Sequence, residues 1–299
     1  MSTQYKVVGI GELLWDILPS GKQLGGAPGN FAYMASMLGD EGIVASRVGN
    51  DPLAEETLVK MRGVGLSTEF LQLDPKHPTG TAVVQIDADG QPKFTITRDV
   101  AWDFLEWTPA WRELAERADV ICFGTLAQRS AASRETIQQF LRSARTSALR
   151  IFDVNLRQNF FSSELLRDSL LNTQIVKLNH DELPVVTQLL GFPFVDEELA
   201  ARQLLDTYGL KLVCITRGGN GSLLVAHSVS SSHKGFPMKV VDTVGAGDAF
   251  TACLAYHFLR GTDLDRINES ANRLAAWVAS QPGATPLRDE PLLKEVLPT

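Results

Sequence analysis

The chain has 299 residues, of which 44% are hydrophobic and 21% are charged, and its formal net charge at pH 7 is −7. This composition is typical of a globular protein with a sizeable core, and the length allows two small domains or one large α/β domain. Because acidic residues outnumber basic ones and no basic block interrupts the chain, we expect no binding to nucleic acid or to an anionic membrane.

Cysteine and histidine spacing predicts no metal-binding cluster. The three cysteines, Cys122, Cys214 and Cys253, lie far apart in apolar or helical segments, which is typical of reduced core thiols in a cytosolic protein. The five histidines show no paired spacing, so we expect no zinc site. No segment approaches the ~20 apolar residues of a membrane span, and no charged region followed by an apolar run opens the chain. We therefore predict a cytoplasmic protein.

The first apolar run, from Lys6 to Gly11, predicts a buried strand. Gly9 and Gly11 look like the beginning of a dinucleotide-binding fingerprint, but Leu14 stands where its third glycine would be. Extended, turn-rich sequence follows instead of a helix. A nicotinamide-dependent dehydrogenase is therefore disfavoured.

A glycine-rich segment, residues 25–30, precedes a predicted helix of small residues at 31–39. The glycines allow the backbone to approach a polar ligand closely, and Asn30 can donate and accept hydrogen bonds at once, as a sugar diol requires. The alternative is a loop in which Asn30 only caps the helix. Further along, residues 79–97 predict two strands around the turn Asp89-Gly90, which is a strong hairpin signal.

The middle of the chain alternates strands, at 119–123 and 150–154, with a helix at about 132–144. Such alternation predicts a parallel sheet covered on both faces, with ligands at the carboxyl ends of its strands. The run Asp153-x-Asn155-x-Arg157 lies at one such end. Another strand, at 175–178, leads into Asn179 and Glu182, whose spacing is also that of a helix-capping box.

Later segments continue this alternation. A strand at 212–216 precedes a glycine-rich turn at 217–221, and the polar residues 228–234 show no periodicity, which predicts an irregular flap. A helix at 271–278 is followed by turn-rich residues at 281–286.

Between these segments, Gly245 and Gly247 flank Ala246 and leave three backbone N–H groups unshielded. The four-residue spacing of Phe250, Leu254 and Phe258 predicts that a buried helix begins here. The start of a helix combines unpaired N–H groups with the positive end of the helix dipole, which favours an anion such as a phosphoryl group. Asp248 could take a proton from a hydroxyl held beside it. The alternative is a tight turn in which Asp248 is only an N-cap.

Residues 242–250, Asp-Thr-Val-Gly-Ala-Gly-Asp-Ala-Phe, resemble the C-terminal signature of the ribokinase-like sugar kinases, also called the pfkB family. Residues 25–30 resemble the family's N-terminal signature, and the runs at 179–182 and 216–221 resemble its Asn-x-x-Glu and Thr-x-Gly-x-x-Gly elements. The resemblance covers nearly the whole chain in the expected order. It departs at Ala54, where a Gly-x-Asp-x-x-Gly element usually has its last glycine.

This resemblance implies a role for each matched residue. Asp248 would be the catalytic base, and the amides of Gly245, Ala246 and Gly247 would form the anion hole. The residues implied in substrate binding are Asp16, Gly26, Asn30, Phe94 and Arg157. The residues implied in ATP binding are Asn179, Thr216, Gly218, Gly221 and Asn272. Glu182 would hold Mg²⁺ through water, and Asp242, Val244 and Gly283 would surround a K⁺ ion if this chain binds one.

The resemblance also implies a fold and an assembly. The expected fold class is α/β: a ribokinase-like, doubly wound, mainly parallel sheet with helices on both faces and a small β-sheet lid. We expect a single kinase domain over residues 1–299, with lid strands at about 12–25 and 79–100. A homodimer formed through the lid is one expected assembly.

The predicted function is transfer of the γ-phosphate of ATP to a sugar hydroxyl. Fructose is the favoured acceptor because residues 11–16, 25–30 and 153–157 resemble the fructokinase branch most. The alternatives are 2-keto-3-deoxygluconate and then another ketose or a pentose. A catalytically silent sugar-binding sensor is the hypothesis from a different class, and the intact Asp248 and Glu182 argue against it.

Overall fold

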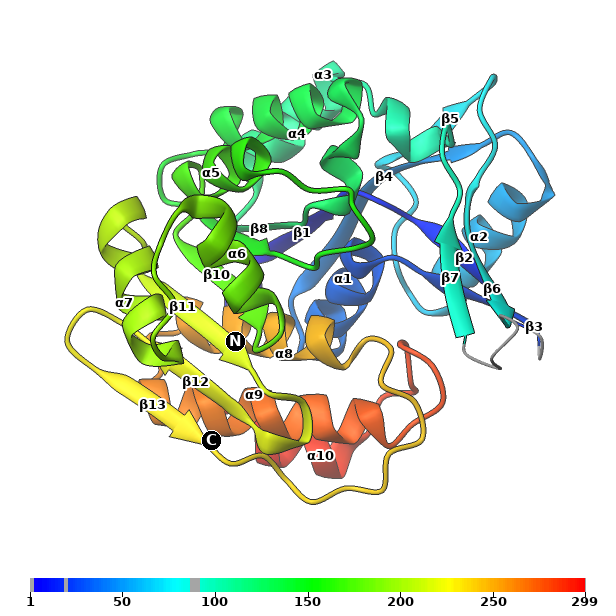
Figure 1. Cartoon of the computed structure of the whole chain (residues 1–299). Coiled ribbons are helices and arrows are strands. Elements are labelled where there is room, and N and C mark those ends of the chain that lie inside the picture. The colour runs from blue at the N-terminus through cyan, green and yellow to red at the C-terminus, as the bar shows by residue number, and fades with distance from the viewer. Residues whose placement is uncertain (1–2, 19–20, 87–91, 299) are drawn as a thin grey trace.

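The computed structural model describes residues 3–18, 21–86 and 92–298, so the predicted turn Asp89-Gly90 lies outside the described residues. Its main element is a nine-stranded sheet in the order β13-β12-β11-β10-β9-β8-β1-β4-β5 (Figure 1). The sheet is parallel from β11 to β5, and only β12 and β13 run antiparallel to their neighbours. The strands are β1 (Lys6–Ile10), β4 (Glu41–Gly49), β5 (Leu71–Asp74), β8 (Val120–Phe123), β9 (Leu149–Asp153), β10 (Ile175–Asn179), β11 (Leu212–Thr216), β12 (Ser222–Val225) and β13 (Ser230–His233).

Helices cover both faces of this sheet, as predicted for the ribokinase-like fold. Figure 1 shows α3, α4 and α5 over one face and α8, α9 and α10 over the other. Alternate residues of one strand enter the two cores: in β8, Ile121 and Phe123 join one buried cluster, and Val120 and Cys122 join the other. The helices are α1 (Ala27–Met37), α2 (Pro52–Gly63), α3 (Pro109–Arg117), α4 (Ala131–Ser143), α5 (Ser163–Leu171), α6 (Glu182–Leu190), α7 (Glu197–Tyr208), α8 (Ala246–Leu259), α9 (Leu264–Ala279) and α10 (Glu290–Val296).

A separate four-stranded sheet, in the order β3-β2-β6-β7, stands beside one end of the large sheet (Figure 1). Its strands are β2 (Leu14–Leu18), β3 (Gly21–Gly25), β6 (Gly80–Ile86) and β7 (Pro92–Ile96). They come from both segments in which lid strands were predicted. The antiparallel pairing of β6 with β7 agrees with the predicted hairpin.

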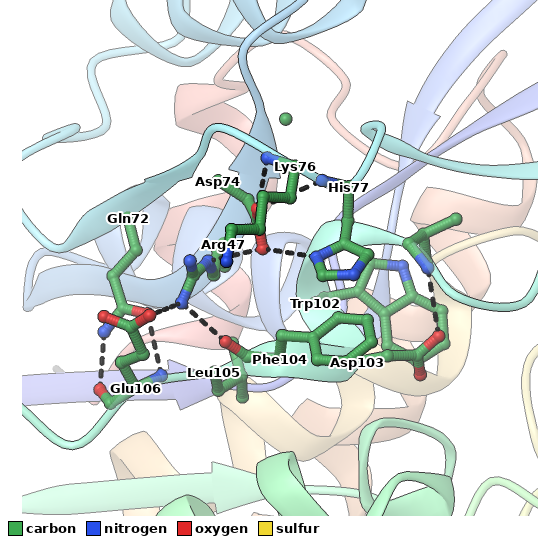
Figure 2. A network of polar contacts seen from close by, with 12 residues as sticks. Arg47, Gln72, Asp74, Lys76, His77, Trp102, Asp103, Phe104, Leu105 and Glu106 are labelled. Carbon is green, nitrogen blue, oxygen red and sulfur yellow. Dashed lines mark hydrogen bonds and ion pairs between the residues drawn. The ribbon is translucent and has the colours of Figure 1, made fainter.

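A polar network joins the base of this small sheet to the edge of the large one. Figure 2 shows the side chain of Arg47, from β4, between the carboxylates of Asp74 and Glu106. Nε of Arg47 lies 3.0 Å from Oδ2 of Asp74, and Nη1 lies 2.6 Å from Oε1 of Glu106 and donates to the carbonyl of Phe104. The ring of Phe104 stacks on His77 with centroids 3.6 Å apart. The chain is thus fixed to the large sheet on either side of the β6–β7 hairpin.

Two local predictions are corrected. Helix α1 begins at Ala27 rather than after Asn30, because Pro28 fits the first turn and Gly26 serves as N-cap, so Asn30 lies inside the helix and does not cap it. The polar segment 228–234 is not an irregular flap. Its residues 230–233 form strand β13, because backbone pairing with β12 requires no apolar side chain and Asn268 of α9 donates to the carbonyl of Ser231.

None of the helices in the described ranges has the length and apolar character that crossing a bilayer would require.

Candidate active site

The N-terminus of α8 lies at the carboxyl end of the large sheet, where Thr251 of the helix donates to Asp153 at the end of β9. Gly245 is the N-cap and has a φ of 80°, which favours glycine. A Cβ on Gly245 would lie 2.6 Å from the Cβ of Ala284, so no larger residue fits there. The N–H of Ala246 donates to the carbonyl of Thr243 at 3.3 Å, which is a long contact. The predicted anion-binding turn is therefore formed by glycines that this backbone requires.

Asp248 is the third residue of α8, and its side chain is only 9% exposed. Nδ2 of Asn30 donates to its Oδ2 at 2.8 Å, so the first helix and the eighth meet through the two residues predicted to bind and deprotonate a hydroxyl. Burial raises the pKa of Asp248 to about 6, and the neighbouring Asp153 also raises it, whereas Asn30, Lys177 and Arg157 lower it. A carboxyl with this pKa is largely ionised at pH 7 and can accept a proton.

A buried ion pair lies directly beneath this turn. Nζ of Lys177, in β10, is 3.0 and 3.1 Å from the two carboxylate oxygens of Asp153 in β9, and the hydroxyl of Thr251 in α8 donates to Asp153 at 2.9 Å. Nζ is also 3.0 Å from where a Cβ on Gly247 would be, so the glycine lets the ammonium approach the helix. Burial lowers the pKa of Lys177, but Asp153, Glu182 and Asp248 together raise it well above its usual value.

Lys177 was missed by the sequence reasoning, which treated 175–178 as an apolar strand. Its position in the sequence could have indicated its role. A lysine within an otherwise apolar strand that is buried on both faces must have a partner of opposite charge.

Asn179 and Glu182 cap helix α6 reciprocally. Oδ1 of Asn179 accepts the N–H of Glu182 at 2.8 Å, and Oε2 of Glu182 accepts the N–H of Asn179 at 2.9 Å. Oε1 of Glu182 accepts the N–H of Leu156 at 2.8 Å. The capping-box alternative is therefore present. Since each carboxylate oxygen keeps a further lone pair, Glu182 also fits a magnesium ion that is held through water.

Asp16, in β2, lies across from the glycine-rich segment. Its Oδ2 is 2.5 Å from where a Cβ on Gly25 would be, so any larger residue at position 25 would have to displace the Asp16 side chain. Burial raises the pKa of Asp16 to about 6, and Arg157 lowers it. Gly26 has a φ of 115°, and a Cβ there would lie 2.6 Å from the carbonyl oxygen of Glu12.

Arg157 itself is exposed and donates to the carbonyl of Leu156 and to Oδ1 of Asn155. Its charge nevertheless lowers the pKa of Glu12, Asp16 and Asp248, so this one cation favours the ionised form of all three carboxyls. The backbone of Phe94 pairs with Val84 in the small sheet, but its side chain lies outside the described part of the chain.

The predicted nucleotide residues fall into two connected groups. Thr216 ends β11, and Gly218 and Gly221 follow it with φ values of 55° and 81°. A Cβ on Gly221 would be 1.9 Å from the carbonyl oxygen of His233. Asn272, in α9, is buried, and its Nδ2 donates to the hydroxyl of Ser222 and to Asn268. Asn272 therefore adjoins the glycine turn, but its amide nitrogen is already engaged by protein groups.

The residues predicted around a monovalent cation are also brought together. Oδ1 of Asp242 accepts the N–H of Val244 at 3.0 Å, and Oδ2 accepts the N–H of Gly283 at 3.2 Å. Asp242 thus joins the segment before α8 to the loop after α9.

A match to the pfkB family of carbohydrate kinases covers residues 20–290 of the chain. An uncharacterised sugar kinase of Pyrococcus horikoshii is 30% identical over 309 residues, with 96% of this chain and 94% of the relative covered. A fructokinase of Escherichia coli is 30% identical over 299 residues, with 93% and 94% covered.

Solved structures agree with these relatives. The Pyrococcus sugar kinase superposes with a TM-score of 0.83 at 28% identity, covering 97% of this chain and 99% of that one, and it has also been solved in complex with ATP. A Vibrio cholerae fructokinase with bound fructose, ADP and potassium ion superposes with a TM-score of 0.80 at 23% identity over the full length of both chains, and this likeness supports the fold.

Proposed function

Because the chain belongs to the pfkB family of carbohydrate kinases and is thereby a sugar phosphotransferase, we propose that it transfers the γ-phosphate of ATP to a hydroxyl of fructose. The observation that carries this proposal is the hydrogen bond between Asn30 and Asp248 at the N-terminus of α8. It brings a hydroxyl-binding amide and a proton acceptor to the end of the helix that favours an anion.

In this proposal the sugar lies between the small sheet and α8. Asp16, Gly26 and Asn30 hold its hydroxyl groups, while Asp248 takes the proton of the attacking hydroxyl. Nδ2 of Asn30 fixes Oδ2 of Asp248, which leaves Oδ1 to receive that proton. Phe94 and the strands of the small sheet cover the sugar and exclude water, so that ATP is not hydrolysed wastefully.

Positive groups at the carboxyl end of the large sheet hold the transferring phosphoryl group. The amides of Gly245, Ala246 and Gly247 and the side chain of Arg157 face its oxygens. Bound Mg²⁺ would neutralise phosphate charge, and Glu182 would hold that ion through water. Thr216, Gly218, Gly221, Asn179 and Asn272 line the nucleotide site. Asp242, Val244 and Gly283 would hold K⁺ beside the turn.

The choice of fructose rests on the sequence motifs and on relatives named fructokinase in Escherichia coli and in maize, the latter 28% identical over 306 residues. The alternatives are 2-keto-3-deoxygluconate and another ketose or a pentose. We also propose one kinase domain over residues 1–299, with the small sheet as its lid and as the surface through which two copies pair.

The test is ADP release from Mg²⁺–ATP with fructose, 2-keto-3-deoxygluconate, ribose, fructose 6-phosphate or adenosine as acceptor. The wild type is compared with Asp248→Asn and with Asp265→Asn, which makes the same change at an exposed aspartate in the first turn of α9. We expect turnover on fructose that falls by roughly 10²–10⁴-fold in Asp248→Asn alone.

Full activity of Asp248→Asn would show that Asp248 is not the catalytic base. If fructose is inert and another acceptor is used, the substrate must be reassigned. Sugar binding without any turnover would replace the kinase by a sugar-binding sensor.

A further inference from the structure

A second buried carboxyl lies beside the proposed sugar site. Glu12 follows β1 at the carboxyl end of the large sheet and is 6% exposed. Its backbone carbonyl packs against Gly26, where a Cβ would be only 2.6 Å away. The residue thus adjoins the glycine-rich segment that is proposed to hold sugar hydroxyls.

The surroundings of Glu12 account for only one of its two carboxylate oxygens. The N–H groups of Glu12 itself and of Ala27 lower its pKa by hydrogen bonding, and Ala27 is the first residue of α1. The N-cap Gly26 has no side chain with which to cap the first turn of α1. Oε2, however, is buried and has no hydrogen-bond partner among the described residues. A buried acceptor without a partner is rare, and a ligand hydroxyl would satisfy it.

The charges that face Glu12 come from three other segments. Asp248 of α8 raises its pKa and Arg157 of the loop after β9 lowers it, while the thiol of Cys122 in β8 has its own pKa raised by Glu12 among other groups. Burial is the largest influence, and the pKa of Glu12 rises to about 7. Glu12 can therefore donate or accept a hydrogen bond near neutral pH.

We propose that Oε2 of Glu12 binds a hydroxyl of the sugar, and that Glu12, Asp16 and Asp248 together restrict the site to neutral polyhydroxylated sugars. This inference rests on the proposed function. These three carboxyls lie near the proposed sugar site, and Arg157 is the cation that lowers the pKa of each of them. Lys177 also lowers the pKa of Asp248, but its ammonium is held by Asp153 and does not influence Glu12 or Asp16 in the same way. A sugar acid or sugar phosphate would add a negative charge beside three carboxyls that already share the exposed Arg157.

The test compares wild type with Glu12→Gln, which keeps the shape and an acceptor for the N–H of Ala27. A matched control is Glu41→Gln, the same change at a half-exposed residue of β4 that pairs with Lys6. Fructose and 2-keto-3-deoxygluconate are used both as ligands in calorimetric titration without nucleotide and as substrates at pH 6.5–8.5. Thermal unfolding verifies that each variant is folded, and Glu12→Asp, which keeps the charge but shortens the reach, serves as a second variant.

For Glu12→Gln we expect fructose binding to weaken on the order of 10-fold. The change should appear as a higher KM, with kcat little altered. The preference for fructose over the sugar acid should fall by a similar factor. In the wild type this preference should rise with pH as Glu12 loses its proton. In Glu12→Gln the preference should not change with pH. Glu12→Asp should lose fructose affinity while still rejecting the acid.

Unchanged fructose binding and unchanged preference in Glu12→Gln would overturn the inference and leave Glu12 with a structural role beside α1. If the wild type turns over sugars in that case, the proposed function survives. If the wild type binds fructose without turnover, the kinase proposal fails, while the binding data still decide the role of Glu12. A wild type that binds no sugar overturns both.

Discussion

Lys177 and Asp153 form an ion pair that is buried beneath the N-terminus of α8, with Nζ about equally far, 3.0 and 3.1 Å, from both carboxylate oxygens. The hydroxyl of Thr251 supplies a further hydrogen bond to the same carboxylate. Because these residues belong to β10, β9 and α8, the pair fixes the helix that carries Asp248 to the sheet.

Replacing Lys177 by Met should therefore destabilise the protein by about 3–5 kcal/mol, because Asp153 would be left buried without its partner. The double variant Lys177→Met, Asp153→Leu should recover most of that loss. Urea denaturation measures both values. Lys6→Met, which breaks a partly exposed pair with Glu41 in a parallel strand, should cost about 1 kcal/mol or less. Equal losses of unfolding free energy in the two lysine variants would show that the buried pair contributes no more to stability than the partly exposed pair.

The pH dependence of kcat should report the ionisation of Asp248. As the proposed base, Asp248 must be deprotonated, and its pKa is about 6, so kcat should rise as pH passes 6 and become constant above about 7. Asp16 titrates in the same range. Asp16→Asn should raise KM for the sugar but keep the rise in kcat, whereas the residual activity of Asp248→Asn should lack it. A pH profile of kcat that is the same in Asp248→Asn and wild type would show that another group is the base.

Asp248→Asn should also make the protein more stable at neutral pH. Burial raises the pKa of Asp248 from 3.8 to about 6, so the folded state binds more protons than the unfolded state between these values. Stability from this carboxyl therefore falls as pH rises from about 4 to 6, by at most about 3 kcal/mol. The free energy of unfolding of the variant should exceed that of wild type above pH 6 and match it below pH 4. A difference that does not change with pH would contradict this account.

Glu182→Gln should weaken the apparent affinity for Mg²⁺ by about 10–100-fold, because the amide carries no charge toward the ion and keeps only one acceptor oxygen for two backbone N–H groups. Titration of activity with Mg²⁺ at fixed ATP measures the change. Glu164→Gln, at an exposed position in the first turn of α5, is the matched control and should behave as wild type. If excess Mg²⁺ fails to restore the Glu182→Gln variant, the residue serves the fold rather than the metal.

Asp242→Ala should alter the response to monovalent cations, because it removes the carboxylate that joins the backbone of Val244 to that of Gly283. The K⁺ concentration that gives half-maximal activation should rise on the order of 10-fold, with little change in the fructose KM. The assay compares K⁺ with Na⁺ at equal ionic strength. Wild-type activity that is identical in both salts would remove the cation site.

The sequence predicted the parallel sheet, the strands at 79–97 and the helix that carries Asp248, because these depend on local apolar periodicity and on glycine and turn signals. The separate small sheet was expected only from the family resemblance. It mistook residues 230–233, since the pairing of β13 depends on a neighbouring strand and on Asn268 rather than on its own serines. Lys177 and Glu12 were missed for a related reason. Their roles come from burial against Asp153, Asp248 and Ala27, which lie far away in the chain or across a turn.

The order in which the helices cover the sheet has a consequence for synthesis of the chain. One face of the large sheet packs on α1, which is made early, and on α8 and α9, which are made late in synthesis. Translation proceeds at roughly 5–20 residues per second, so on the order of 10–40 s separate α1 from α8. During that interval the apolar residues of β1, β8 and β10 on this face have no helical cover from α8. A nascent chain that stalls before residue 246 would therefore expose an apolar surface and lack Asp248.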